Sequence, residues 1–393
     1  NADISTINGT VFLWAGNDTM EGSPNDGVNL AAGTQLSSGD GNVRIVAAME
    51  SDIYLNQIEA GGGSVSLLAE GNIADNNGAT INVTASVLRA VADSNGDQAG
   101  WIGQHDALNA DERANVKAID TQVATLAARS ADGTYIVETD SLNIDLTGDI
   151  IVEQVRINST TTMRTDASLS DLVTTDSGSI KVVALTGGIT VNEGDADDSG
   201  VSAGLAGNVL LESRGAASDI ILNADLRSGS GHISVVADND IAGNSDVTTA
   251  DGTVFVWAKN GTTNGVPNDG VNLALDTIIN SGAGNVRIVA GGESDIRLNQ
   301  ILAGAGSVSL VAQRDILDNN AAANNVTAAV LRMEADSNKD MAGQVGGSDS
   351  ANGDPAANVN AIDTEVATIA AISADGIYIM ETDGLLVDMI GAI

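Results

Sequence analysis

Oxygen-bearing side chains occupy alternate positions in one acidic turn, and this turn occurs twice in the chain. The six residues are Asp93, Asn95 and Asp97, followed 243 residues later by Asp336, Asn338 and Asp340. Oxygen ligands at positions one, three and five are typical of the start of a calcium-binding loop. The twelfth position, Gln104 or Gly347, lacks the bidentate glutamate of an EF-hand. We therefore predict a partial Ca²⁺ site at these residues, with a solvated acidic turn as the alternative.

Side chains suited to catalysis are few. The chain has two histidines, His105 and His232, and Ser348 stands 243 residues after the first of them. The chain has no cysteine, which removes thiol nucleophiles and thiolate metal ligands. Because 53 acidic residues would pair by chance almost anywhere, a glycosidase-like pair of carboxylates cannot be located. We predict no catalytic residue and no organic cofactor.

The acidic turns lie among short strands, which a repeating pattern predicts. The motif Gly-x-[Val/Ile]-x-[Ile/Leu]-x-Ala begins at Gly284 and again at Gly306, 22 residues later. Inward-facing residues alternate with others over 286–290, which is the period of a β-strand, and further short strands are expected at 296–298 and near Ile301. Glycine, serine, asparagine and aspartate at the corners permit tight bends. The repeat therefore has the length and chemistry of one turn of a solenoid.

Short strands repeated at this spacing, without long helical segments, are most simply stacked turn on turn. We predict an all-β chain that forms one single-stranded, right-handed parallel β-helix. Dividing 393 residues by about 24 per turn gives roughly 16 turns, each of about 20 to 32 residues. Residues 118–129 also fit an amphipathic helix, although their period-two alternation favours a strand. The expected inward ladder includes Val43, Ile45, Ala47, Val65, Leu67, Val286, Ile288, Val308 and Leu310.

A larger repeat covers most of the chain. GTVFLWA at Gly9 returns as GTVFVWA at Gly252, and GNVRIVA at Gly41 returns unchanged at Gly284, so both pairs are 243 residues apart. We interpret 1–150 as the first copy of a 243-residue unit, 151–251 as β-helix coils that link the copies, and 252–393 as a second copy of residues 9–150. We expect the second copy to stop within a unit and the chain to be part of a longer protein.

The composition limits the classes of partner that the chain could bind. The formal net charge of −37 is unsuited to a nucleic-acid backbone or an anionic membrane surface. No apolar run of about 18 residues occurs, so no transmembrane segment is predicted. Aromatic residues make up 2% of the chain, which suits a narrow interior of stacked aliphatic side chains. The absence of cysteine is compatible with export across a membrane.

One outward position of the coils is apolar in eight of them. It holds Trp14, Val46, Leu68, Val183, Val236, Trp257, Val289 and Val311. Stacked at about 4.8 Å, these side chains would form a stripe, and exposed apolar stripes mark interfaces. We predict self-association or lateral packing with another surface chain through this stripe. The alternative is that long inserts starting at Asn17 and Asn260 cover it.

The coils carry a family resemblance. Repeated G-x-V-x-[IL]-x-A followed by [SN]-D-I-x-L resembles filamentous-haemagglutinin-like and related giant bacterial surface proteins. The resemblance implies a right-handed parallel β-helix exported to the bacterial cell surface as an adhesin or fibre, with a glycan or a host or cell-surface ligand. The sequence thus favours a non-enzymatic extracellular structural or adhesive protein. The alternative is a polysaccharide-binding or polysaccharide-degrading β-helix enzyme, which rests on fold analogy.

Overall fold

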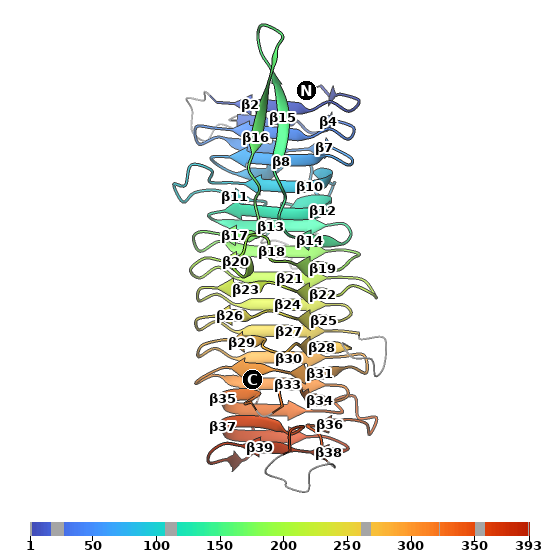
Figure 1. Cartoon of the computed structure of the whole chain (residues 1–393), viewed down its shortest axis with the longest axis vertical. Coiled ribbons are helices and arrows are strands. Elements are labelled where there is room, and N and C mark those ends of the chain that lie inside the picture. Colours follow the sequence, from blue (N-terminus) through green and yellow to red (C-terminus); the bar gives the residue numbers. More distant parts are fainter. Residues whose placement is uncertain are drawn as a thin grey trace. The chain divides into compact units, whose positions relative to one another are not determined.

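The computed structural model describes residues 2–16, 27–106, 116–260, 269–321, 323–349, 358–391 and 393. These residues form β-strands and connecting turns and no helix (Figure 1). The chain divides into two compact units, one of residues 1–187 with 191–208 and the other of 188–190 with 209–393. The predicted all-β parallel β-helix is confirmed in each of them.

In the first unit three ladders of parallel strands run side by side. The first contains β2 (Val11–Ala15), β5 (Val43–Ala47), β8 (Ser64–Ala69), β10 (Val83–Val91) and β12 (Ile119–Ser130). The second contains β3 (Gly27–Asn29), β6 (Asp52–Leu55), β9 (Ile73–Asp75), β11 (Trp101–Ile102), β13 (Gly133–Glu138) and β18 (Ser179–Ala184). The third contains β1 (Ile4–Ser5), β4 (Gln35–Ser37), β7 (Gln57–Glu59) and the first halves of β10 and β12. The remaining parallel strands are β14 (Leu142–Ile144), β17 (Leu172–Thr174), β19 (Ile189–Val191), which includes residues of both units, and β20 (Ser199–Ala203).

The second unit repeats this arrangement. Its first ladder contains β21 (Val209–Ser213), β24 (Ile233–Ala237), β27 (Val254–Ala258), β30 (Val286–Ala290), β33 (Ser307–Ala312), β35 (Val326–Glu334), β37 (Ile362–Ile372) and β40 (Leu386–Val387). Its second contains β22 (Ile220–Leu222), β25 (Ile241–Gly243), β28 (Gly270–Leu273), β31 (Asp295–Leu298), β34 (Ile316–Asp318), β36 (Gln344–Val345) and β38 (Gly376–Ile377). Its third contains β23 (Asp225–Ser228), β26 (Val247–Thr249), β29 (Ile278–Asn280), β32 (Gln300–Leu302), the first halves of β35 and β37, and β39 (Ile379–Glu381).

The interior is a stack of aliphatic side chains in register. Val43 pairs with Val65 and Ile45 with Leu67 across neighbouring turns of the first unit. All nine residues of the predicted inward ladder are at most 1% exposed, which confirms that assignment. Because each inward residue lies directly over its counterpart in the next turn, the period-two pattern sets both the strand and the core.

Two smaller predictions about the strands are also resolved. Residues 118–129 fall almost entirely within β12, so the strand interpretation is confirmed and the helical one is wrong. The expected third strand near Ile301 is β32.

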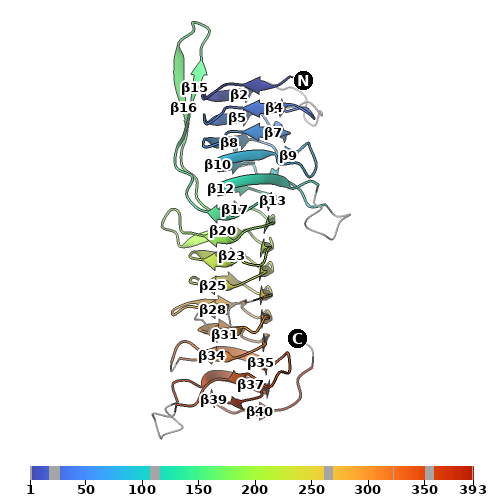
Figure 2. The same cartoon turned by 90° about the vertical axis from the view of Figure 1, so that its right-hand side faces the viewer.

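The linking segment departs from the expected coils at its start. Strands β15 (Ile150–Val155) and β16 (Thr161–Asp166) pair antiparallel and form a separate two-stranded sheet. Figures 1 and 2 show this hairpin running across the strands of the first unit, on the outside of the stack, with its turn extending beyond β2. Ser159 has a φ of 62°, and the amide of Arg156 donates to the carbonyl of Thr160, which closes the turn. Residues 150–166 therefore cover the β-helix instead of extending it.

Candidate functional site

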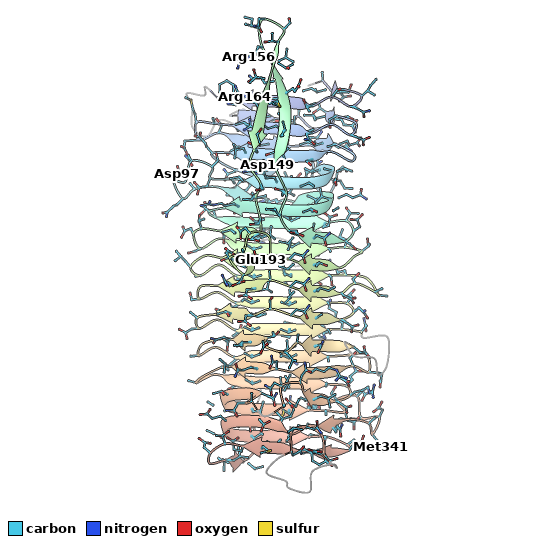
Figure 3. The ribbon with its side chains drawn as sticks, in the orientation of Figure 1. Asp97, Asp149, Arg156, Arg164, Glu193 and Met341 are labelled. Atoms are coloured by element: carbon cyan, nitrogen blue, oxygen red, sulfur yellow. The ribbon has the colours of Figure 1, made fainter. Side chains whose placement is uncertain are left out.

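The outer hairpin lies on the face of the first unit that the sequence marks as an interaction surface. Ile150 and Val152 are at most 1% exposed, whereas Ile151 on the opposite face of β15 is 43% exposed. The alternation in β15 therefore buries one side of the strand against the stack. Figure 3 shows Arg156, at the turn, beyond the end of the stack of strands.

A carboxylate at the end of the hairpin anchors it. Asp166 accepts two hydrogen bonds of 2.7 Å from Arg44 Nε and Nη2, and a third of 2.6 Å from Ser66 Oγ. The side chains of Arg44 and Asp166 are only 13% and 7% exposed. Burial by itself would raise the pKa of Asp166, but the hydrogen bonds from Arg44 and Ser66 and the charge of Arg44 outweigh it and lower the pKa. Asp166 is thus a charged anchor with bidentate geometry.

Further polar contacts fix the rest of the hairpin. The side-chain amide of Asn42 donates to the carbonyl of Ile151 at 3.0 Å, and the backbone amide of Glu153 donates to Thr10 Oγ1 at 3.0 Å. Arg89 Nε donates to the carbonyl of Ala167 at 3.0 Å, just after β16. Together with the bond from Ser66, these contacts come from four successive turns of the β-helix, so the hairpin is fixed to all four of them.

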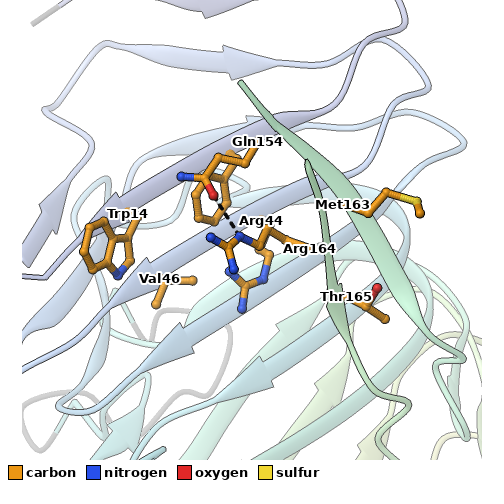
Figure 4. Close-up of a pocket in the computed structure, with 8 residues that line it drawn as sticks. Trp14, Arg44, Val46, Gln154, Met163, Arg164 and Thr165 are labelled. Carbon is orange, nitrogen blue, oxygen red and sulfur yellow. Dashed lines mark hydrogen bonds between the residues drawn. The ribbon is translucent and has the colours of Figure 1, made fainter. Parts of the chain in front are cut away.

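A groove remains between the hairpin and the strands beneath it. It has a volume of about 470 Å³ and is lined by Phe12, Trp14, Arg44, Val46, Gln154, Met163, Arg164 and Thr165 (Figure 4). Trp14 is 62% exposed, and the guanidinium of Arg44 lies 5.4 Å from the centre of the Phe12 ring. Arg164 Nε donates to Gln154 Oε1 at 2.8 Å. The groove therefore combines an exposed aromatic ring with fixed polar groups, and protein sites with this combination bind amphipathic ligands.

The outward slot is in register but is neither uniformly apolar nor uniformly exposed, since Glu212 occupies it opposite Val236 and Glu334 occupies it opposite Val311. Trp14 pairs with Val46, and Trp257 pairs with Val289, as the stripe prediction requires. Val46, Val183 and Val236 are at most 8% exposed, however, and Trp257 is 37% exposed. In the first unit Val46 lies in the groove that the hairpin residues Gln154 and Met163 also line. The insert that follows Asn260 and the one that begins at Asn17 lie outside the described residues, so the alternative cover is not visible.

The predicted calcium loops are turns held by their own backbone. Asp93 Oδ1 accepts a hydrogen bond from the amide of Gln98 at 3.2 Å, and Asp97 Oδ1 accepts one from Ala99 at 3.1 Å. The side-chain amide of Asn95 donates to Glu50 Oε1 at 2.6 Å. The loop projects from the side of the first unit at the labelled Asp97 in Figure 3. Calcium binding by this loop stays a prediction.

The second loop has the same construction. Asp336 Oδ1 accepts a hydrogen bond from Met341, Asp340 Oδ1 accepts one from Ala342, and Asn338 donates to Glu293 Oε1 at 2.7 Å. Glu50 and Glu293 are therefore equivalent acidic neighbours that the sequence reasoning missed. Burial, followed by a hydrogen bond with Asp97, raises the pKa of Glu50. The signal was available in the 243-residue offset between the two glutamates.

A different acidic cluster has the geometry for a cation. Oxygens of Asp171, Asp195 and Asp197 all lie within 4.8 Å of one another, and in the part of the chain that the structure describes no other three acidic or histidine side chains come so close. Asp171 is 2% exposed and its Oδ1 has no hydrogen-bond partner. Burial, together with the charges of Asp195 and Asp197, raises the pKa of Asp171 to about 7. Three hard oxygen donors of this kind suit Ca²⁺ or Mg²⁺.

The sequence did not reveal this cluster because its members come from two coils. Asp195 and Asp197 belong to an obvious acidic run, Glu193–Asp198, whereas Asp171 lies 22 residues before the start of this run. Only the stacking of β17 on β20, with Leu172 opposite Val201, brings them together. An alignment of the coil sequences by strand register, with Leu172 opposite Val201, would have placed these three aspartates close together.

Comparisons with known proteins add no further identification. The chain matches no family model, no curated protein and no solved structure. Within the described residues, no segment forms a helix with the length and apolarity needed to span a membrane.

Proposed function

We propose that this chain is a segment of a non-enzymatic extracellular protein of the bacterial cell surface, with a structural or adhesive role. The observation that carries the proposal is the outer hairpin. Residues Arg44, Ser66 and Arg89 of successive coils are used to hold another β-element against the face of the β-helix. A face built to hold secondary structure serves assembly better than turnover of a small substrate.

The resemblance to filamentous-haemagglutinin-like proteins and the internal duplication support the same proposal. A copied stack presents the same surface more than once, which raises the avidity of weak contacts without any new one. The exposed Trp14 beside Arg164 is where an amphipathic ligand such as a glycan would bind in an adhesive form of this function. In this proposal Ca²⁺ bound by Asp171, Asp195 and Asp197 has a structural role, because it would relieve the repulsion among three acidic side chains.

An enzyme acting on polysaccharides is the second candidate, and one observation favours it. Burial raises the pKa of Asp120 to about 7 and that of its counterpart Asp363 to about 6, and each has one buried oxygen without a hydrogen bond. A carboxyl that is protonated near neutral pH can act as a general acid. Each of these carboxyls faces a second aspartate, Asp75 or Asp318, whose charge adds to the shift. We rank this candidate second because carboxyl groups that are stacked in neighbouring coils of a purely structural β-helix would show the same raised pKa.

Sedimentation velocity on the purified chain tests the structural form of the proposal. We expect concentration-dependent assembly of the parent through the outward slot of the second unit. Changing Val289 and Val311 together to Lys should reduce this assembly while leaving the circular-dichroism spectrum unchanged, since both side chains point away from the core. A parent chain that stays monomeric at every concentration, or a double variant that assembles like the parent, contradicts the proposal.

A further inference from the structure

The surface that holds the hairpin in the first unit is repeated, residue for residue, in the second. The five side chains that hydrogen-bond the hairpin or its flanks are Thr10, Asn42, Arg44, Ser66 and Arg89. Their counterparts 243 residues later are Thr253, Asn285, Arg287, Ser309 and Arg332, and all five residue types are unchanged. Only some positions of the repeat are unchanged, so the retention of this whole set points to a shared contact surface.

The second set is also arranged in the same register. Arg287 pairs with Ser309 and Ser309 with Arg332, as Arg44 pairs with Ser66 and Ser66 with Arg89. Asn285 Oδ1 accepts a hydrogen bond from the amide of Ser307 at 2.9 Å, and Asn42 does the same with Ser64 at 2.9 Å. The guanidinium of Arg287 lies 6.0 Å from the centre of the Phe255 ring, where Arg44 lies over Phe12. Arg287 and Arg332 are therefore already held in the arrangement that Arg44 and Arg89 have beneath the hairpin.

The two surfaces differ in what lies on them. In the first unit Asp166 neutralises Arg44, whose side chain is 13% exposed. Arg287 is exposed and forms no ion pair with any residue that the structure describes. Arg287, Ser309 and Arg332 line a cavity of about 490 Å³ together with Ile390, Gly391 and Ile393. The position equivalent to Asp166 thus holds open space beside a positive charge.

One substitution accompanies this difference. Glu334 stands where the first copy has Val91, and its carboxylate pairs with Arg332 Nη2. Arg89 in the first unit contacts the hairpin through its Nε, which donates to a backbone carbonyl. The pairing of Arg332 with Glu334 uses Nη2, so the Nε position that corresponds to the first-unit contact is a separate donor. Glu334 therefore orients Arg332 without replacing the aspartate that Arg287 lacks.

We propose that Arg287, Ser309 and Arg332 form a docking surface for a second β-hairpin of the Ile150–Asp166 kind. The occupant is an antiparallel hairpin whose second strand ends in an aspartate. Its aspartate accepts hydrogen bonds from Arg287 and Ser309, and the carbonyl that follows accepts one from Arg332. Its first strand meets Asn285 and Thr253. This inference rests on the contacts alone and stands whether or not the protein is adhesive.

The test adds the hairpin in cis. Ile393 is the counterpart of Ile150, so a variant in which the sequence Ile151–Leu169 follows Ile393 places a second hairpin at the equivalent position. The readout is trypsin cleavage at the added copy of Arg164, compared with cleavage at the native Arg164 in the same chain. We expect the added hairpin to be protected. Replacing its aspartate by Asn, or making Arg287→Met, should raise its cleavage rate roughly 150-fold, which corresponds to the lower limit of the cost of breaking one side of a buried ion pair.

Two outcomes overturn the inference. The first is an added hairpin that is cleaved at the rate of an unstructured peptide while the native hairpin stays protected, since the native hairpin reports that the chain is folded. The second is protection that persists in Arg287→Met.

If the extended chain does not fold, a second experiment takes the place of the cleavage assay. A synthetic Thr147–Leu169 peptide is titrated into the parent chain, and binding is measured by calorimetry. Binding lost in Arg287→Met and retained in Arg44→Met supports the docking surface, and the absence of binding overturns it.

Discussion

The replacement Arg44→Met should release the outer hairpin of the first unit without unfolding the coils. Methionine keeps much of the aliphatic stem of Arg44 but removes both hydrogen bonds to Asp166. Asp166 is 7% exposed, so the variant leaves a buried carboxylate held by Ser66 alone. Breaking one side of a buried pair costs about 3–5 kcal/mol because the remaining charge loses its partner.

This cost falls on the hairpin, because the hairpin can detach while the strands of the stack keep their own ladder bonds. With 1.36 kcal/mol for each factor of ten, about 3 kcal/mol raises the detached population by about 150-fold. Arg164 lies on β16 and is a trypsin site that a detached hairpin presents freely. When opening is fast, the cleavage rate follows this population, so cleavage at Arg164 should accelerate by about two orders of magnitude.

The duplication supplies a matched control. Arg287→Met removes the equivalent arginine from the second unit, where it forms no ion pair with any described residue, and should leave cleavage at Arg164 unchanged. Hydrogen exchange over residues 150–166 gives an independent measure of the same opening. Cleavage and exchange that stay within twofold of the parent in Arg44→Met would refute the role of Asp166 as the anchor.

Three further predictions concern the core, the cation and the pH. Ile288→Asp places an unpaired carboxylate at a position that is 0% exposed and should lower the thermal transition markedly; an unchanged transition would show that Ile288 does not face inward. Ca²⁺ should raise the thermal transition temperature of the parent but not that of Asp171→Asn. If the predicted loop also binds Ca²⁺, titration calorimetry should give smaller heats for the double variant Asp93→Ala, Asp97→Ala than for the parent. Equal heats would show that the loop does not bind Ca²⁺. Because the pKa of Asp171 is raised to about 7, the folded state binds more protons than the unfolded chain between about pH 4 and 7. Stability should therefore rise as the pH falls from 8 to about 5, and a thermal transition that falls over this range would contradict the raised pKa.

The strands and the core followed from the sequence because one physical rule controls both. In a parallel β-helix each inward residue stacks on its counterpart in the next coil, as Val286 does on Val308. The same alternation of inward and outward residues therefore recurs from coil to coil. The β12 strand was predictable for the same reason. Local alternation is sufficient wherever the chain continues to wind.

The hairpin was not predictable by that rule. Ile150–Val155 alternates like any other strand, and nothing in its own sequence says that it leaves the stack and pairs antiparallel. The available signal was indirect, since Arg44 and Ser66 place a cation and a hydroxyl in register on an outward face. The acidic cluster at Asp171 was missed for a related reason: its members meet only through the stacking of two coils.

Incubation of the purified chain with a panel of acidic and neutral polysaccharides, followed by detection of new chain ends, tests the non-enzymatic function most directly. We expect no depolymerisation at any pH between 5 and 8, in the presence or absence of Ca²⁺, by the parent chain or by Asp120→Asn with Asp363→Asn. Release of oligosaccharides by the parent, abolished in that double variant, would contradict a structural or adhesive role and establish the enzyme in its place.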